Sequence, residues 1–116
     1  MSGNTADLQA LSVRQLRARR GRFATALQRP EATLPGTLVR QGRTCSSSGC
    51  RCRRGEFHGP YLYLALYSGG RNRTLYVPAA IEAVVDEYVS VTHRNDVALA
   101  EIAQINIELL GRRALG

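Results

Sequence analysis

The alternation of apolar and polar residues over positions 61–78 predicts a β-hairpin. The segment reads YLYLALYSGGRNRTLYVP, and Gly69 and Gly70 would form a two-residue turn between its two strands. One face of this hairpin then pairs Leu62 with Val77, Leu64 with Leu75 and Leu66 with Arg73. The opposite face pairs Tyr63 with Tyr76, Ala65 with Thr74 and Tyr67 with Asn72. Because a shift of one residue would mix the two faces, the pattern specifies the register.

A second periodicity predicts a basic helix over residues 5–28. Thr5 would be its N-cap, Asp7 lies in the first turn, and Pro30 follows its end. An apolar stripe at helical spacing is completed by one arginine, and its members are Val13, Leu16, Arg20, Phe23 and Leu27. The next residues, RPEATLPG, predict a loop, and TLVRQ at 37–41 predicts a short strand.

A third pattern predicts a long helix over residues 79–110. Its apolar positions follow steps of three and four, which is the seam of a coiled coil or of a helix pair: Ile81, Val84, Tyr88, Val91, Asn95, Ala98, Ile102, Ile105 and Leu109. We expect this seam to make the protein a homo-oligomer, with the polar Asn95 fixing register or subunit number. The alternative is a break between two shorter helices at THRND, with Asn95 in a turn.

These elements predict a single α+β domain over residues 1–116. A small zinc-stabilised β-hairpin unit at 36–78 would be flanked by the N-terminal helix and the long, coiled-coil-like C-terminal helix. A chain of 116 residues can bury only a modest core, so a metal ion or oligomerisation would add useful stability.

The charge is strongly positive and unevenly distributed. All 16 basic residues are arginines, and the formal net charge is +7. Residues 36–78 carry seven arginines and one acid, whereas residues 79–116 carry three arginines and six acids. The positive field is therefore densest around the hairpin, which favours phosphate or carboxylate partners.

The most specific chemical signal is the cysteine segment TCSSSGCRCRRGEFHGPY. Cys45, Cys50, Cys52 and His58 supply three thiolates and one imidazole, a complete tetrahedral set for Zn²⁺. A full set leaves no position for a reactive water, so the expected zinc site is structural. Two alternatives remain open: redox-active or disulfide-forming thiols, and inert free thiols. His93 could replace one ligand, but we expect it to be exposed on the acidic helix.

The run at 36–78 resembles the core of a family of small, functionally uncharacterised bacterial and archaeal proteins. The resemblance rests on the C-x4-C-x-C segment, on the HGPY tetrapeptide beginning at His58, on the tyrosine-rich hairpin and on the YVP ending at Tyr76. Members are often met near transposases and other mobile elements. The family usually has a Lys-Pro-Gly type turn between its first two cysteines, where this chain has Ser46–Ser48 before Gly49. The resemblance implies a zinc hairpin and a nucleic-acid context, and it names no activity.

Arginine and tyrosine together predict a nucleic-acid-binding surface, with DNA favoured over RNA as the ligand. The candidate residues are Arg40, Arg43, Arg51, Arg53, Arg54, Arg71, Arg73, Tyr63 and Tyr67. If the terminal helices covered the tyrosine face, however, these tyrosines would be core residues. The main alternative function is a protein–protein interaction or assembly adaptor that binds an acidic partner and self-associates through its C-terminal helix. A third is a redox- or metal-responsive regulator.

We expect no enzymatic activity. The acids cluster on one helix without a paired base, there is no phosphate-binding glycine loop, and strand alternation already accounts for the tyrosines. The chain has neither an apolar run of the roughly 20 residues needed to span a bilayer nor a signal-peptide layout, so we expect a cytoplasmic protein.

A structural zinc site makes a direct prediction. Replacing Cys50 or Cys52 with serine should lower zinc content and thermal stability together, because the free energy of metal binding is also free energy of folding. Metal analysis and thermal melting of the purified variants would check this. Unchanged melting in a variant that has lost its metal would contradict it.

Overall fold

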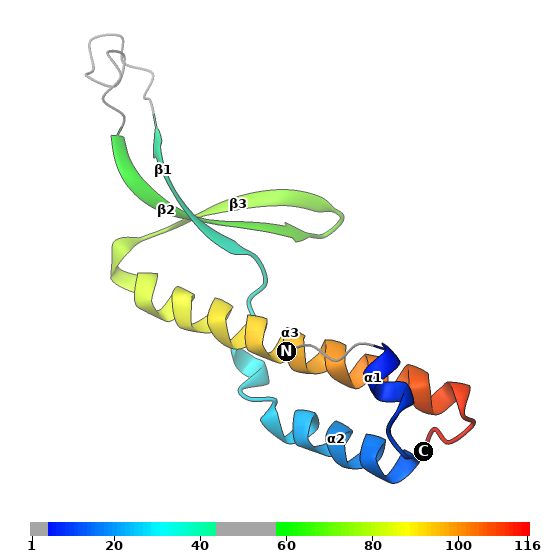
Figure 1. The fold of residues 1–116 in the computed structure, drawn as a ribbon. Coiled ribbons are helices and arrows are strands. Elements are labelled where there is room, and N and C mark those ends of the chain that lie inside the picture. The colour runs from blue at the N-terminus through cyan, green and yellow to red at the C-terminus, as the bar shows by residue number, and fades with distance from the viewer. Residues whose placement is uncertain (1–4, 44–57) are drawn as a thin grey trace. The chain divides into compact units, whose positions relative to one another are not determined.

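The computed structural model describes residues 5–43 and 58–116, and its fold is α+β, as predicted (Figure 1). In chain order, the elements are α1 (Thr5–Gln9), α2 (Val13–Ala26), η1 (Pro30–Ala32), β1 (Thr37–Arg43), β2 (His58–Ser68), β3 (Arg71–Val77), η3 (Ala79–Ile81) and α3 (Glu82–Gly111).

The chain forms two compact units. We call Met1–Ala32 with Val91–Gly116 the helical unit, and Thr33–Ser90 the sheet unit. The long helix α3 contributes its first turns to the sheet unit and the rest to the helical unit.

The sheet unit is built on a three-stranded antiparallel sheet in the order β1-β2-β3. The predicted hairpin register is confirmed at every pair, from Leu62 opposite Val77 to Tyr67 opposite Asn72. Gly69 and Gly70 form the turn with φ of +63° and +81°, the two positive values that a type I′ turn requires. The predicted strand at 37–41 is also present, extends to Arg43, and pairs with β2.

The leucine face of this sheet is its buried face. Leu62, Leu64 and Val77 form a core with Val89 of α3, and Leu34, Leu38, Leu66 and Val85 pack around it. Gly36 lies at the entry to β1 with φ of +121°, where an added Cβ would come within 2.7 Å of the Ala65 carbonyl oxygen. That position therefore needs glycine for both backbone conformation and space.

The N-terminal segment is two helices rather than the single helix expected over 5–28. Ser12 caps α2: its Oγ accepts a hydrogen bond from the Gln15 amide, and the Ser12 amide donates to Gln15 Oε1. This capping box supplies the side-chain bonds with which a helix starts anew, so the continuous helix is interrupted at residues 10–12. In the sequence, the helical spacing of the apolar residues gave no sign of this interruption.

The helical unit closes around Leu8, Leu16, Ile105 and Leu109, each at most 1% exposed. In Figure 1, α2 runs antiparallel beside the C-terminal part of α3. Arg112 joins the two ends of the chain. Its guanidinium donates to the carbonyls of Leu11 at 2.6 Å and of Leu8 and Gln9 at 3.1 Å, while its Nε donates to Glu108. One arginine thus binds carbonyl oxygens at the end of α1.

The predicted seam of α3 is used differently in the two units. Val91, Ala98, Ile105 and Leu109 are buried within the chain, so this part of the seam packs as a helix pair on the N-terminal segment. That burial removes Val91, Ile105 and Leu109 from the surface to which we assigned oligomerisation. Ile81 and Val84 are 46% and 53% exposed, and their neighbours Val85 and Val89 pack on the sheet instead.

The helix α3 is continuous from Glu82 to Gly111, so the alternative of a break at THRND is wrong. Asn95 lies inside the helix, and its side-chain amide bonds to both backbone groups of Gln28. Its Oδ1 accepts from the Gln28 amide at 3.1 Å, and its Nδ2 donates to the Gln28 carbonyl at 2.6 Å. The polar member of the seam therefore fixes register within the chain, where the residues after α2 meet α3.

In a coiled-coil seam, replacing a buried asparagine with leucine stabilises the assembly. The bonds of Asn95 to Gln28 predict the opposite effect here. Replacing Asn95 with leucine should destabilise the protein by about 1 kcal/mol, because the Gln28 amide and carbonyl lose their partners. The measurement is thermal unfolding, supported by hydrogen exchange of the Gln28 amide. Arg94→Leu, an exposed neighbour on the same helix, is the matched control. A more stable Asn95→Leu variant would contradict the intrachain role.

Candidate nucleic-acid interface

The face of the sheet opposite the leucines carries four tyrosines. The side chains of Tyr67 and Tyr76 are 67% and 55% exposed, and Tyr61 is 40% exposed. Tyr63 is half-buried between its strand neighbours. In the sheet unit, α3 packs on the leucine face and not on the tyrosine face.

Three of these rings form a cluster. Tyr76 meets Tyr61 edge to face, with ring centroids 6.0 Å apart and planes at 84°. It also meets Tyr63 at 5.8 Å and 60°. Such edge and tilted contacts are favourable and leave flat ring surface available, and they hold the rings in defined positions. Tyr67 lies four residues after Tyr63 on β2, which corresponds to about 13 Å at the rise of an extended strand.

The tyrosine face is uncharged over the strand positions whose side chains the structure describes. Strand alternation and pairing give its other members as Thr37, Val39, Gln41, Ala65, Asn72 and Thr74. Val39 is 38% exposed, and Gln41 is exposed beside Tyr61. The predicted binding residues did not include Tyr61 or the residues that β1 adds to this surface. The partial alternation of TLVRQ was too short to show which face each residue would take.

The predicted arginines whose side chains the structure describes, Arg40, Arg71 and Arg73, lie on the other face of the sheet. Arg73 pairs with Leu66 and Arg71 with Ser68, so both belong to the leucine face, where they are exposed beside the hairpin turn. The predicted residues are therefore divided: the tyrosines share one face, and these two arginines flank it from the opposite side. The sequence could have predicted this separation, because the predicted register already paired Arg73 with Leu66 on the leucine face.

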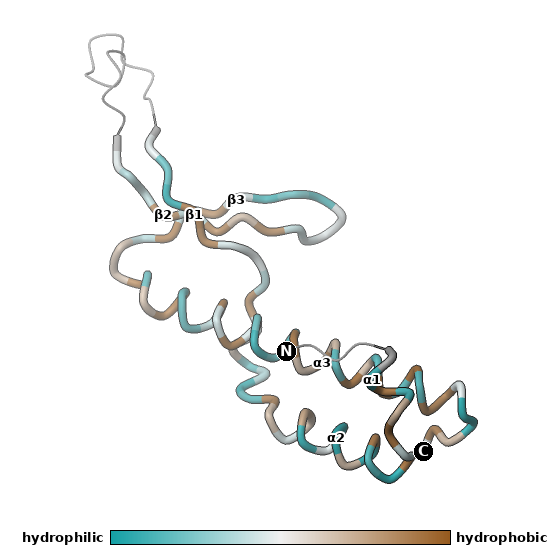
Figure 2. The backbone as a smooth tube through the Cα atoms, in the orientation of Figure 1, coloured by the Kyte–Doolittle hydropathy of each residue, from teal (hydrophilic) through white to brown (hydrophobic). Residues whose placement is uncertain are grey.

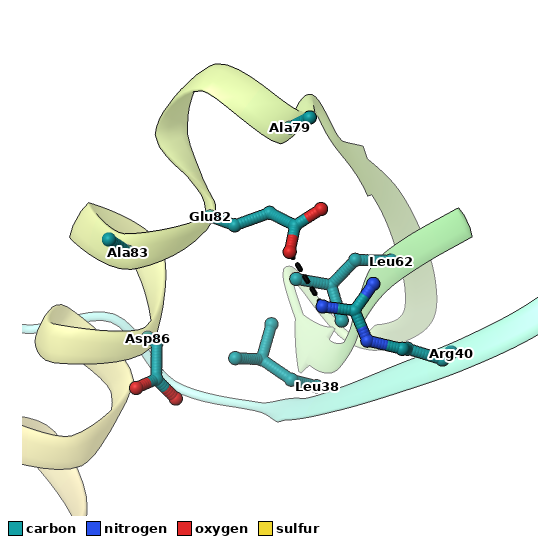
Figure 3. A pocket seen from close by; sticks show the side chains of 7 residues that line it. All are labelled: Leu38, Arg40, Leu62, Ala79, Glu82, Ala83 and Asp86. Carbon is teal, nitrogen blue, oxygen red and sulfur yellow. Dashed lines mark hydrogen bonds and ion pairs between the residues drawn. The ribbon is translucent and has the colours of Figure 1, made fainter. Parts of the chain in front are cut away.

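Arg40 is engaged within the sheet unit. Its guanidinium nitrogen lies 2.6 Å from Glu82 Oε1, at the start of α3. Figure 3 shows this pair at the edge of a shallow open pocket lined by Leu38, Arg40, Leu62, Ala79, Glu82, Ala83 and Asp86. Arg40 lies opposite Leu62 on the leucine face, and its side chain is 55% exposed. Its contact with Glu82 makes it less available to phosphate than its sequence context suggested.

Most of the predicted metal site lies outside the described residues. Cys45, Cys50 and Cys52, together with Arg51, Arg53 and Arg54, fall in the segment 44–57. His58 begins β2 and is paired through its backbone with Arg43 of β1. Within the residues that the structure describes, no group of three or more His, Cys, Asp or Glu side chains could hold a metal ion. The zinc prediction therefore rests on the donor set of the sequence.

A second positive surface lies on α2. This helix contains arginines and no acids, and Arg14, Arg17 and Arg22 are exposed, as the predicted stripe required. Arg20 is turned to α3, where it donates to Asn106 Oδ1 at 2.8 Å. The helical unit thus adds positive charge to that of the sheet unit. No helix among the described residues is long and apolar enough to cross a membrane.

Comparison with known proteins identifies a family to which the chain is similar. The model of a domain of unknown function, DUF6788, matches residues 13–87, which run from the start of α2 through the cysteine segment and the sheet into the first turns of α3. Neither the curated proteins nor the solved structures contain a match to this sequence. The matched region covers more than half of the chain and all three strands, so the protein belongs to the DUF6788 family.

Proposed function

We propose that this protein is a non-enzymatic, zinc-stabilised nucleic-acid-binding protein that binds single-stranded DNA on the tyrosine face of its sheet. The observation that carries the proposal is the direction of burial. The helix α3 packs on the leucines, and the tyrosine rings of β2 and β3 stay accessible within the most positively charged part of the sequence.

The chemistry of the face suits unpaired bases. A base exposes two flat π surfaces once it leaves a duplex, and a tyrosine ring can stack on either, with each stacked base contributing about 1–3 kcal/mol. The cluster at Tyr76 and the separate ring of Tyr67 offer two stacking positions about 13 Å apart along the strands. That distance leaves room for nucleotides between the two stacked bases.

The charge distribution supports a strand running along this surface. Arg71 and Arg73 are exposed at the turn end of the hairpin. In the sequence, Arg51, Arg53 and Arg54 precede the opposite end of β2. Bases would contact an uncharged centre, and phosphates would reach arginines at the two ends, because guanidinium groups donate several hydrogen bonds to phosphate oxygens.

Zinc has a structural part in this proposal. Cys45, Cys50, Cys52 and His58 would hold the ion and tie the segment after β1 to the first residue of β2. The donor set fits Zn²⁺ chemically, since thiolates and imidazole are its preferred ligands in structural sites. Such an ion would contribute folding free energy to a small sheet, because metal binding and folding are coupled.

The mobile-element setting implied by the resemblance is consistent with this activity. Excision and insertion of DNA expose single strands, and an accessory factor or regulator that binds them needs no catalytic group of its own. An acidic protein partner is the second candidate function, and the exposed arginines favour it as much as they favour phosphate. The tyrosine face distinguishes the two, because an acidic protein gains less from an uncharged stacking surface.

Fluorescence anisotropy with labelled oligo(dT), a duplex of the same length and the matching RNA tests the proposal. Tyr67→Ala should weaken binding of oligo(dT) by about 5- to 100-fold, because one stacked base is lost. The matched control is Leu75→Ala, which truncates an exposed side chain of β3 on the opposite face and should change the Kd less than about twofold.

Salt dependence gives an independent readout. The logarithm of the binding constant should fall with the logarithm of salt concentration, with a slope of about −0.7 per phosphate contact for a single strand. Arg71→Gln and Arg73→Gln should each make that slope less steep, whereas Tyr67→Ala should leave it unchanged. Equal binding by wild type and Tyr67→Ala, or no binding of nucleic acid by the zinc-loaded wild type, would contradict the proposal.

A further inference from the structure

The C-terminal half of α3 has an unusual distribution of polar residues. Between Val97 and Leu110 the polar side chains are Glu101, Gln104, Asn106 and Glu108. Three of them point into the helical unit or bond within it: Glu101 is only 6% exposed, Asn106 accepts from Arg20, and Glu108 accepts from Arg112. Gln104 is the exception and is exposed.

The outer face of the same turns is apolar. Leu99, Ile107 and Leu110 are 50%, 61% and 62% exposed, and the exposed Ala103 lies between them. Helical geometry places Leu99, Ala103, Ile107 and Leu110 on one narrow stripe, at steps of four, four and three. We call these four residues the outer stripe. Figure 2 shows how frequently hydrophobic residues recur over this part of α3.

A helix that is apolar on both sides is normally covered on both sides. The helices α1 and α2 cover one side of α3 through Leu8 and Leu16, which pack on Ile105 and Leu109. The outer stripe lies on the other side, and covering its half-exposed leucine and isoleucine side chains would remove further apolar surface from water, which is favourable. Large apolar residues gathered in this way mark an interaction surface.

We propose that the outer stripe is the interface of a homodimer, in which α3 of one copy packs antiparallel on α3 of a second. This surface differs from the seam that the sequence suggested, because Ile105 and Leu109 of that seam already pack within the chain. The inference does not rest on the proposed nucleic-acid function, so either can fail without the other.

Charge selects a second copy as the occupant. Two chains with a net charge of +7 repel each other, and they can meet closely only where positive charge is absent. The outer stripe contains no charged residue and lies in the segment 79–116, which carries six acids and three arginines. An isologous interface must be complementary to itself, and an uncharged apolar stripe meets that condition. A strongly acidic partner would instead be drawn to the exposed arginines of α2.

The stripe also indicates the direction of packing. Ala103 lies at its middle, and its small side chain lets two helices cross closely there. About an antiparallel two-fold axis at Ala103, Leu99 of one copy packs near Ile107 of the other. The acidic Asp96 then approaches the end of the partner's α3, which is followed by the exposed Arg113. Antiparallel packing also places opposite ends of the two helix dipoles together.

Sedimentation velocity and native mass spectrometry of the full chain as purified test the proposal. Wild type should be dimeric at micromolar concentration, and Ile107→Glu should weaken the dimer at least about tenfold, because two carboxylates would be buried in an apolar contact. The matched control is Val84→Glu, which places the same charge at a similarly exposed apolar position of α3 and should stay dimeric. Circular dichroism melting confirms that both variants fold.

The outcomes separate clearly. A dimer that Ile107→Glu dissociates and Val84→Glu leaves intact supports the outer stripe. A monomeric wild type at 100 μM or so overturns it, because the gain from burying the stripe should exceed the cost of association at that concentration. A dimer that dissociates with Val84→Glu and survives Ile107→Glu overturns it as well, since the subunits would then meet through the N-terminal turns of α3.

Discussion

The packing of Leu62 and Leu64 of β2 against Val85 and Val89 of α3 is the contact on which the sheet unit depends. A sheet with one apolar face must bury that face against another element, and here the element is α3. Because strand neighbours alternate between faces, covering the leucines leaves the tyrosines on the other side. The candidate interface is thus a consequence of which face the helix covers. The same contact places Arg40 beside Glu82 and removes it from that interface.

The helical unit is organised around polar contacts at its two ends. Arg112 binds three carbonyl oxygens of the N-terminal segment, and Asn95 binds both backbone groups of Gln28. Between them, Leu8 and Leu16 meet Ile105 and Leu109. The polar groups satisfy backbone atoms that α1 and α2 leave open where they end, which is where isolated short helices are weakest. In the C-terminal half of α3, Glu101, Asn106 and Glu108 turn inward, and apolar residues are left on its outer face.

Much of the fold could be predicted because its signals are local. The hairpin register followed from alternation and from Gly69 and Gly70, whose positive φ values suit the turn. The long helix followed from its periodicity. The interruption at Ser12 was missed, since a capping box in a chain of good helix formers competes with continuation by only a small free energy. The candidate site was predicted in part: Tyr63 and Tyr67 share an open face, whereas Arg40, Arg71 and Arg73 lie on the other one.

The sequence by itself determined the three strands, the long C-terminal helix, the two faces of the hairpin, the positive field around it and a donor set suited to zinc. Each of these depends on residues close together in the chain, where alternation, charge and spacing act directly. The tertiary structure decided which face α3 covers and which stripe of that helix is used inside the chain. Those choices depend on contacts between residues far apart in sequence, such as Leu64 with Val89 and Leu16 with Ile105. A periodic stripe specifies that a face will be buried, and only the folded chain specifies against what.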